Sequence, residues 1–163
     1  MDVRPVPVVV AREVSLKSIV LKFTLFLFIS ILILPRAFAQ QSIGEVLEKY
    51  NSGSVPYISV EELRMHQLEG DVIILDAREK EEYEVSHIKN ATFVGFDEFD
   101  ISKLDKFGKD ERIVVYCSVG VRSEKIGDRL QKAGYKNILN LYGGIFAWKD
   151  TGYEVIDSEG KKT

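Results

Sequence analysis

Short apolar runs alternate with amphipathic segments over most of the chain. Residues 72–75 (VIIL) and 112–116 (RIVVY) lack a regular polar alternation, which is typical of strands buried on both faces of a sheet. Residues 92–94 (TFV) and 138–141 (ILNL) predict two further strands. These four runs therefore predict a central sheet that is covered on both faces.

Amphipathic segments between these runs predict the helices. Ser59 followed by Glu62 has the spacing of a capping box, which predicts a helix that begins there. Residues 123–133 carry apolar side chains at helical spacing, and Gly134 is placed to end that helix. A last helix contains Trp148. Because strands alternate with helices, we expect an α/β fold with a mostly parallel central sheet flanked by helices.

The first 39 residues differ in composition from the rest. They hold five of the 22 basic residues but two of the 25 acidic ones, together with an apolar run of 12 residues at 23–34 and the triplet Ala37-Phe38-Ala39. These features predict a secretory signal peptide that is cleaved after Ala39. A spanning helix needs about 20 apolar residues, so we favour cleavage and export to the periplasm. An uncleaved membrane anchor is the alternative.

The chain is expected to divide into four parts. A weak helical pattern at 43–50 precedes a polar stretch at 51–54, which indicates a short helix and a linker. The final residues are polar, and we expect them to be frayed. The predicted parts are the signal peptide 1–39, the short helix and linker 40–56, the α/β domain 57–157 and the polar tail 158–163.

Composition and charge exclude several classes of protein. The chain is 45% hydrophobic and 29% charged, which excludes a wholly disordered protein. Residues 40–163 hold 17 basic and 23 acidic residues, a net charge of −6, so we expect no nucleic-acid partner. The single cysteine, Cys117, excludes an intramolecular disulfide and a zinc site built from several thiolates. We expect no metal site.

Cys117 lies where a ligand site is expected in a sheet of this kind. It follows the strand that ends at Tyr116, and ligands bind outside the carboxyl ends of such strands. Backbone N–H groups of a tight loop and of a helix start favour ionisation of a thiol, and the thiolate is the nucleophile. The predicted substrate-binding loop comprises Ser118, Val119, Gly120, Val121, Arg122 and Ser123.

Each of these residues also has an ordinary structural interpretation. Cys117 can be an inert buried residue, although a loop at a strand end is not a core position. Arg122 supplies a fixed cation for an anionic substrate, or else it is a salt-bridged residue at a helix start. Gly120 gives access to backbone angles that other residues resist, as a glycine does in any turn.

Three segments of the α/β domain carry a more specific signal. They are LDAREKEEY at 75–83 with SHIKNA at 86–91, then YCSVGVRS at 116–123, then LYGGIFAW at 141–148. Together and in this order, they resemble the rhodanese domain, the sulfurtransferase family. The resemblance covers roughly residues 59–155 and implies that the α/β domain is rhodanese-like.

The resemblance implies sulfur transfer through a cysteine persulfide. The Cys117 thiolate takes the sulfane sulfur of thiosulfate, or of a low-molecular-weight or protein persulfide, and passes it to a thiol or to cyanide. Two half-reactions imply ping-pong kinetics, and no cofactor is expected. The expected substrate is a small sulfur-containing anion or a thiol, and the expected protein partner is a thiol-redox protein.

The resemblance assigns other residues to structural support. They are Asp76, Arg78, Glu82, His87, Gly143, Gly144 and Trp148. Of these, Asp76, Arg78 and Glu82 are expected to form one buried polar network behind the loop. His87 is expected to make a backbone hydrogen bond, and the two glycines to turn the chain into the last helix.

Two other functions stay open. A sulfur-carrier or redox-partner-binding module with little turnover of its own would use the same Cys117. An oxyanion enzyme, either a phosphatase or an arsenate reductase, is the other. The related phosphatases have five residues between the cysteine and the arginine of this loop, whereas four separate Cys117 from Arg122. The loop interior carries no charge, so a persulfide donor is as well supported as thiosulfate.

Overall fold

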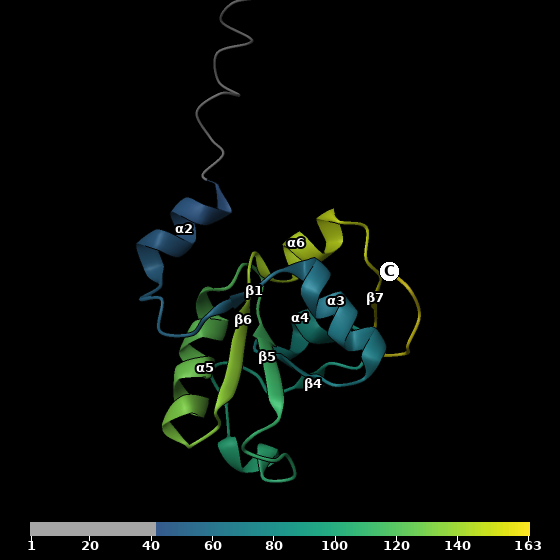
Figure 1. The fold of residues 1–163 in the computed structure, drawn as a ribbon. Helices are drawn as coiled ribbons and strands as arrows, with labels where there is room; N and C mark the ends of the chain where they lie inside the picture. Colours follow the sequence, from purple (N-terminus) through teal and green to yellow (C-terminus); the bar gives the residue numbers. More distant parts are fainter. Residues whose placement is uncertain (1–41) are drawn as a thin grey trace, which may run out of the picture. The chain divides into compact units, whose positions relative to one another are not determined.

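The computed structural model describes residues 42–163 (Figure 1). The predicted signal peptide, with its cleavage site after Ala39, lies outside the described residues. Among residues 42–163, no helix has both the length and the apolar character needed to cross a membrane.

A five-stranded parallel sheet forms the centre of the described structure. Its strand order is β1-β6-β5-β2-β4. The strands are β1 (Tyr57–Ile58), β2 (Ile73–Asp76), β4 (Thr92–Phe93), β5 (Arg112–Tyr116) and β6 (Asn137–Leu141). The four strands predicted from apolar runs are confirmed. The sequence pattern did not predict β1, because an edge strand of two residues has no apolar run of its own.

Helices cover both faces of this sheet. The helices are α2 (Ile43–Tyr50), α3 (Val60–Glu69), α4 (Lys80–Val85), α5 (Val121–Lys132) and α6 (Gly144–Asp150), with a 3-10 helix at Ile101–Leu104. Helices α3 and α6 cover one face, and α5 covers the other (Figure 1). Their apolar side chains belong to two separate clusters, one on each face. The predicted α/β fold with a mostly parallel sheet is therefore confirmed.

The central strands are apolar throughout because their alternate side chains enter two cores. Val114 of β5 lies in the cluster with Trp148, whereas its neighbour Val115 lies in the cluster with Ile126 and Leu130. These two valines and the Trp148, Ile126 and Leu130 side chains around them are all buried. Full burial of an aliphatic or large apolar side chain stabilises a fold by about 1.5–3 kcal/mol, so each central strand stabilises both cores.

Local sequence signals explain where two of the helices begin. The Oγ of Ser59 accepts a hydrogen bond from the Glu62 N–H at 3.1 Å, which is one half of the predicted capping box of α3. Helix α5 begins at Val121, two residues before the predicted start. Gly120 has a φ of 117°, so the chain already turns into the helix at that glycine.

The C-terminal residues correct the prediction of a frayed tail. Strands β3 (His87–Ile88) and β7 (Val155–Ile156) pair antiparallel, and the chain then folds back so that Ile156 bridges Lys162. The Asp157 carboxylate accepts hydrogen bonds from the N–H groups of residues 159 and 161 and so closes the turn. A polar sequence is therefore ordered here by a local turn rather than by burial.

Candidate active site

Cys117 lies at the carboxyl end of β5, at the first position after the strand. The loop from residue 117 to 120 connects β5 with α5, and the predicted loop residues 121–123 form the first turn of α5. The thiol is unpaired, and the residue is 1% exposed. The sulfur therefore lies at the bottom of a closed turn, where backbone groups rather than water surround it.

Hydrogen-bond donors converge on the Cys117 sulfur. The Gly120 N–H donates to Sγ at 3.1 Å, and the Ser123 hydroxyl lies 3.5 Å from Sγ. Burial raises the pKa of the thiol, but hydrogen bonds from Ser123, Gly120 and Val119 outweigh it, so the pKa lies below its ordinary value. The geometry therefore favours a thiolate, which is the reactive form of a cysteine.

Helix α6 holds the opposite side of the loop. The Ile145 N–H donates to the Cys117 carbonyl at 2.9 Å, and the Phe146 N–H donates to the Ser118 carbonyl at 3.2 Å. A Cβ at Gly144 would lie 2.3 Å from the Cys117 carbonyl oxygen, so only glycine fits this contact. Since the Cys117 and Ser118 carbonyls face α6, the loop N–H groups are free to face the sulfur.

The glycine pair turns the chain as expected. Gly143 and Gly144 have φ values of 71° and 55°, in the left-handed region that favours glycine. The turn brings the first residues of α6 back against the loop that begins at Cys117.

Arg122 is engaged by an acidic side chain instead of facing open space. Its guanidinium donates to both carboxylate oxygens of Glu82, at 2.8 and 2.9 Å, and to the Ser118 hydroxyl at 2.9 Å. The hydrogen bonds that Glu82 accepts, above all from Arg122, lower its pKa from 4.5 to about 2, against the opposing effect of burial. The fixed cation that the sequence places beside the loop is therefore neutralised by a partner on α4.

The expected three-residue network behind the loop is divided in two. The Arg78 guanidinium donates to the Asp76 carboxylate, at 2.7 Å for the shortest contact, and the Tyr116 hydroxyl donates to the same carboxylate. Glu82 lies outside this pair and binds Arg122. The network divides because each guanidinium neutralises one carboxylate. Arg78 is bound by Asp76, so Glu82 pairs with the other guanidinium, that of Arg122.

His87 and Trp148 have contacts of a structural kind. The His87 ring stacks on Tyr83 with centroids 3.9 Å apart, and its Nδ1 lies 2.9 Å from the Tyr83 carbonyl oxygen. The Trp148 indole is buried in the core, and its Nε1–H donates to the Glu154 carbonyl at 3.0 Å. Neither side chain has a hydrogen bond to the Cys117 loop.

Sequence reasoning missed two asparagines that contact the loop. The amide of Asn140 on β6 and the amide of Asn51 after α2 both donate to the Gly120 carbonyl, at 2.8 and 3.0 Å. The Asn140 carbonyl oxygen also accepts a hydrogen bond from the Ser123 hydroxyl at 2.7 Å. A polar residue inside the apolar run ILNL was a readable signal for Asn140, because a fully buried amide needs partners.

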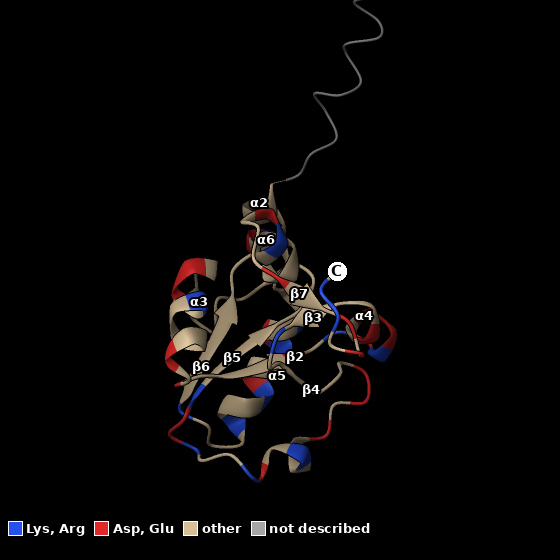
Figure 2. Ribbon diagram, turned by 90° about the vertical axis from the view of Figure 1, so that its right-hand side faces the viewer, with Lys and Arg blue, Asp and Glu red and all other residues tan. Residues whose placement is uncertain are grey.

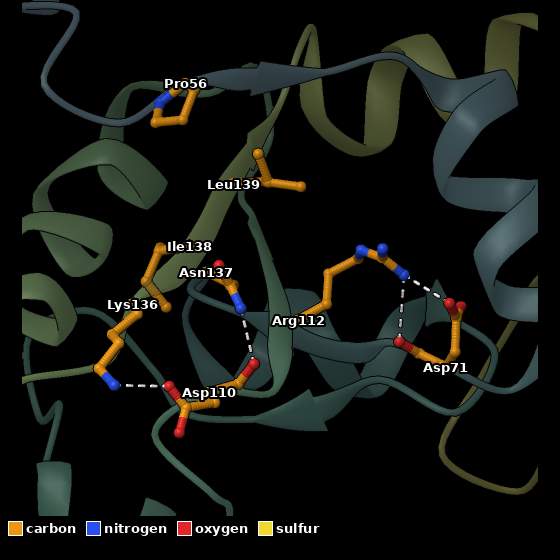
Figure 3. A pocket seen from close by; sticks show the side chains of 8 residues that line it. All are labelled: Pro56, Asp71, Asp110, Arg112, Lys136, Asn137, Ile138 and Leu139. Atoms are coloured by element: carbon orange, nitrogen blue, oxygen red, sulfur yellow. Dashed lines mark hydrogen bonds and ion pairs between the residues drawn. The ribbon is translucent and has the colours of Figure 1, made fainter.

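A cavity of about 460 Å³ lies at the other end of the sheet, beside the amino ends of β5 and β6 (Figure 3). Its basic side chains are paired: Arg112 with Asp71, and Lys136 with Asp110. The cavity is lined by Pro56, Asp71, Asp110, Arg112, Lys136, Asn137, Ile138 and Leu139. It shares no residue with the Cys117 loop.

One group of metal-ligand side chains lies near this cavity. His66, Glu69 and Asp71 place their ligand atoms within 4.8 Å of one another. The Arg112 guanidinium already lies 3.0 Å from the His66 Nδ1 and bonds to the Asp71 carboxylate. The Arg112 guanidinium thus already engages two of the three side chains, His66 and Asp71, which disfavours a metal ion there.

Comparison with known proteins identifies the domain around Cys117. The sequence model of the family described as Rhodanese-like domain matches residues 59–151. A tRNA uridine(34) hydroxylase from Onion yellows phytoplasma is 36% identical over 97 residues, which are 56% of this chain and 32% of that protein. The chain thus spans about a third of the length of that curated relative.

Solved structures agree with the family match. A rhodanese-like domain protein from Staphylococcus aureus is 34% identical, with a TM-score of 0.52 over 58% of this chain and 91% of that one. A thiosulfate sulfurtransferase from Pseudomonas aeruginosa is 24% identical, with a TM-score of 0.60 over 72% of this chain and 23% of that one. The second likeness concerns the fold alone.

Proposed function

Because this chain belongs to the family of rhodanese-like domains, we propose that it is a sulfurtransferase that carries sulfane sulfur on Cys117. The observation that supports this most directly is the set of donors around the Cys117 sulfur. The Gly120 N–H and the Ser123 hydroxyl stabilise a negative charge on this sulfur, and so they favour the thiolate that attacks a sulfur donor.

The proposed first half-reaction is a displacement at sulfur. The Cys117 thiolate attacks the outer sulfur of thiosulfate, a new S–S bond forms, and the S–S bond of thiosulfate breaks. Sulfite leaves with the electron pair of the broken bond, so the negative charge stays on the Cys117 persulfide. A persulfide donor reacts in the same way and releases a thiolate. No oxidant or reductant is consumed.

The second half-reaction needs another molecule. Cyanide or an external thiolate attacks the terminal sulfur, and the Cys117 thiolate leaves with the electron pair. Cys117 is the chain's single cysteine, so no internal thiol can discharge the persulfide. This supports a thiol-redox protein or a small thiol as acceptor. A sulfur-carrier module that turns over slowly without its partner is the alternative within the same chemistry.

The neutralisation of Arg122 bears on the choice of donor. With its guanidinium bound to Glu82 and no charge among residues 118–121, the loop offers a doubly charged anion only N–H and hydroxyl donors. We therefore propose that a low-molecular-weight or protein persulfide is a better donor than thiosulfate. An oxyanion enzyme is less well supported, since four residues separate Cys117 from Arg122.

The relatives from Onion yellows phytoplasma and Streptococcus suis are named tRNA uridine(34) hydroxylase. The proposed sulfur reaction therefore rests on the geometry around Cys117 and not on those names. Residues 40–163 carry a net charge of −6, and acidic and basic residues are interspersed over the described helices and loops (Figure 2). A protein that binds RNA needs a basic surface. We therefore propose no tRNA substrate for this chain.

The proposed place of the reaction is the periplasm. The basic residues, the 12-residue apolar run and the triplet ending at Ala39 support export and cleavage. Expression of the full chain in a Gram-negative host tests this proposal by intact mass. A mature chain that begins at Gln40 in the periplasmic fraction supports it, whereas an uncleaved chain in the membrane fraction indicates the anchor.

Intact-mass spectrometry of the purified protein tests the sulfur reaction. We expect a gain of about 32 Da after incubation with thiosulfate or a small persulfide, and its loss after addition of cyanide or a thiol. The Cys117→Ser variant is the control and gains nothing. If the thiol is shown to be reduced and no donor produces the adduct, the sulfurtransferase proposal is wrong.

A further inference from the structure

Residues 42–58 lie outside the family match, yet they contact the Cys117 loop directly. Leu47 of α2 is buried, and its Cδ2 would lie 3.1 Å from a Cβ placed on Gly120. Asn51, the residue that ends α2, donates its side-chain amide to the Gly120 carbonyl at 3.0 Å. A segment that precedes the matched domain therefore forms one wall of the loop.

Gly120 is the residue on which these contacts converge. Its N–H donates to the Cys117 sulfur at 3.1 Å, while its carbonyl accepts from the amides of Asn51 and Asn140. The N–H and the carbonyl belong to one glycine with φ 117° and ψ 3°, in a region where glycine moves easily. Two amide donors on the carbonyl restrict that movement, and so they keep the N–H directed at the sulfur.

We propose that Asn51, together with Asn140, is a positioning residue that holds Gly120 so that its N–H stays on the Cys117 sulfur. The inference rests on the proposed function for its purpose, because a fixed donor stabilises the thiolate that this function needs. Because Asn51 precedes the rhodanese-like domain, the proposal gives residues 42–58 a role in the site.

Glu124 fixes the position of the segment that carries Asn51. This carboxylate on α5 is buried, and its Oε1 accepts hydrogen bonds from the Ser52 N–H at 2.7 Å and from the Gly53 N–H at 3.0 Å. The hydroxyls of Ser52 and Ser54 donate to the same oxygen at 2.9 and 3.2 Å. Asn51 is therefore held by the residues that follow it, and its contact with Gly120 does not depend on α2 alone.

A purely structural role for Asn51 makes a different prediction. Its amide also donates to the Tyr57 hydroxyl at 2.8 Å, and its N–H ends α2 by donating to the Leu47 carbonyl. If Asn51 served only these contacts, its loss would loosen the segment without changing the ionisation of Cys117. The pH profile of the thiol separates the two roles.

The test is the pH dependence of alkylation of the full chain by iodoacetamide, measured by intact mass. The single cysteine makes the measurement specific to Cys117. The variants are Asn51→Ala, Tyr57→Phe and Asn137→Ala. Tyr57→Phe removes the other partner of the Asn51 amide. Asn137→Ala removes a side-chain hydrogen bond at the far end of β6, where the Asn137 amide donates to the Asp110 carbonyl.

We expect the midpoint of the Asn51→Ala profile to move to higher pH. The variant lacks the Asn51 hydrogen bond to the Gly120 carbonyl, so the Gly120 N–H is no longer held on the sulfur. The thiolate fraction at neutral pH should then be about threefold to tenfold lower. The midpoint is the readout, because the intrinsic reactivity of a thiolate rises with its pKa and partly hides the change at any single pH. Tyr57→Phe and Asn137→Ala keep the wild-type midpoint.

The charged groups that face the loop are the same in all of these variants. They are Arg122 with its partners Glu79 and Glu82, and Glu124 on α5. A changed midpoint in Asn51→Ala therefore reports the lost amide and not an altered charge.

Two results would overturn the inference. One is a wild-type midpoint for Asn51→Ala in a protein that unfolds at the wild-type temperature. The other is an equal displacement of the midpoint in all three variants, which would indicate general loosening. Alkylation needs no sulfur donor, so failure of the persulfide assay leaves this test intact, and the two failures are distinguishable.

Discussion

The two ends of the parallel sheet treat charge in different ways. At the amino end, Arg112 and Lys136 each meet an aspartate in a half-buried or exposed pair beside the cavity (Figure 3). At the carboxyl end, the Cys117 loop meets mostly backbone N–H groups and amides, and its one guanidinium, on Arg122, is bound by Glu82. Both ends carry paired charges, but only at the carboxyl end do backbone N–H groups converge on a thiol.

The two ends differ in which groups already have a partner. At the amino end both members of each ion pair are bound, whereas in the Cys117 loop the carbonyls are bound and the N–H groups remain for the sulfur. In an ion pair, both partners are satisfied and their fields largely cancel. In the loop, the carbonyls of Cys117, Ser118 and Gly120 accept hydrogen bonds from α6, β6 and the residue after α2. The N–H groups are left to face the sulfur, and a fixed set of such groups stabilises a negative charge without a neighbouring cation.

The largest predicted difference between the two ends of the sheet is the stability lost when a glycine is replaced by alanine. Gly144→Ala places a Cβ 2.3 Å from the Cys117 carbonyl oxygen, whereas Gly134→Ala, between α5 and β6, meets nothing within 4 Å. Both have positive φ, so both add backbone strain. Strain and overpacking each cost roughly 1–3 kcal/mol, so we expect about 4 kcal/mol of lost stability for Gly144→Ala and about 1 kcal/mol for Gly134→Ala in urea unfolding.

The comparison also has a functional arm. Gly144→Ala should lose the persulfide adduct of Cys117 even where the protein still folds, since the loop carbonyl must move. Gly134→Ala keeps the adduct. Equal losses of stability in the two variants would show that the contact between Gly144 and the loop is not the constraint described above.

The next largest predicted difference between the two ends is the stability lost when the cation of an ion pair is removed. Asp76 and Arg78 are 0% and 5% exposed at the side chain, whereas Asp110 and Lys136 are 77% and 69% exposed. Arg78→Met leaves a buried carboxylate without its partner, so we expect a loss of about 3 kcal/mol. Lys136→Met should cost less than about 1 kcal/mol. Chemical unfolding of both variants measures the difference, and similar costs would contradict the contrast in burial.

Release of Arg122 should alter donor choice without changing the fold. Glu82→Gln removes the carboxylate that neutralises the guanidinium. We expect the KM for thiosulfate to fall about tenfold, equivalent to about 1.4 kcal/mol of binding. Glu81→Gln, on the exposed side of the same helix, makes the same charge change without this contact and should leave KM unaltered. An equal fall in both variants would indicate a general effect of net charge.

The sequence predicted the sheet and the position of the Cys117 loop at its edge, but not the contacts that hold the loop. Strands β2, β5 and β6 were readable because each is a run of apolar residues, and the Cys117 loop was readable from its place after β5. The pairing of Arg122 with Glu82 joins residues 40 positions apart. No local pattern encodes such a contact, because a charged residue at a helix start fits water as well as a partner.

Asn51 and Asn140 show two degrees of the same difficulty. Asn140 interrupts an apolar strand, so its burial and its need for partners could have been inferred from sequence. Asn51 stands in a polar stretch that reads as an ordinary linker. Its contact with Gly120, 69 positions away, depends on how α2 and the residues bound by Glu124 pack, which only the tertiary structure defines.

The smallest expected effect is the pH dependence of the Glu82–Arg122 pair. Hydrogen bonds from Arg122 lower the pKa of Glu82 from 4.5 to about 2, so the folded state binds this proton less tightly than the unfolded state does. The stabilisation is therefore fully present above about pH 4.5 and is lost as pH falls towards 2. The Glu82 side chain is 36% exposed, so water and salt reduce the effect. Urea unfolding at several pH values should show wild type and Glu82→Gln converging as the solution is acidified. A constant difference between them would mean that the carboxylate contributes through packing and not through its charge.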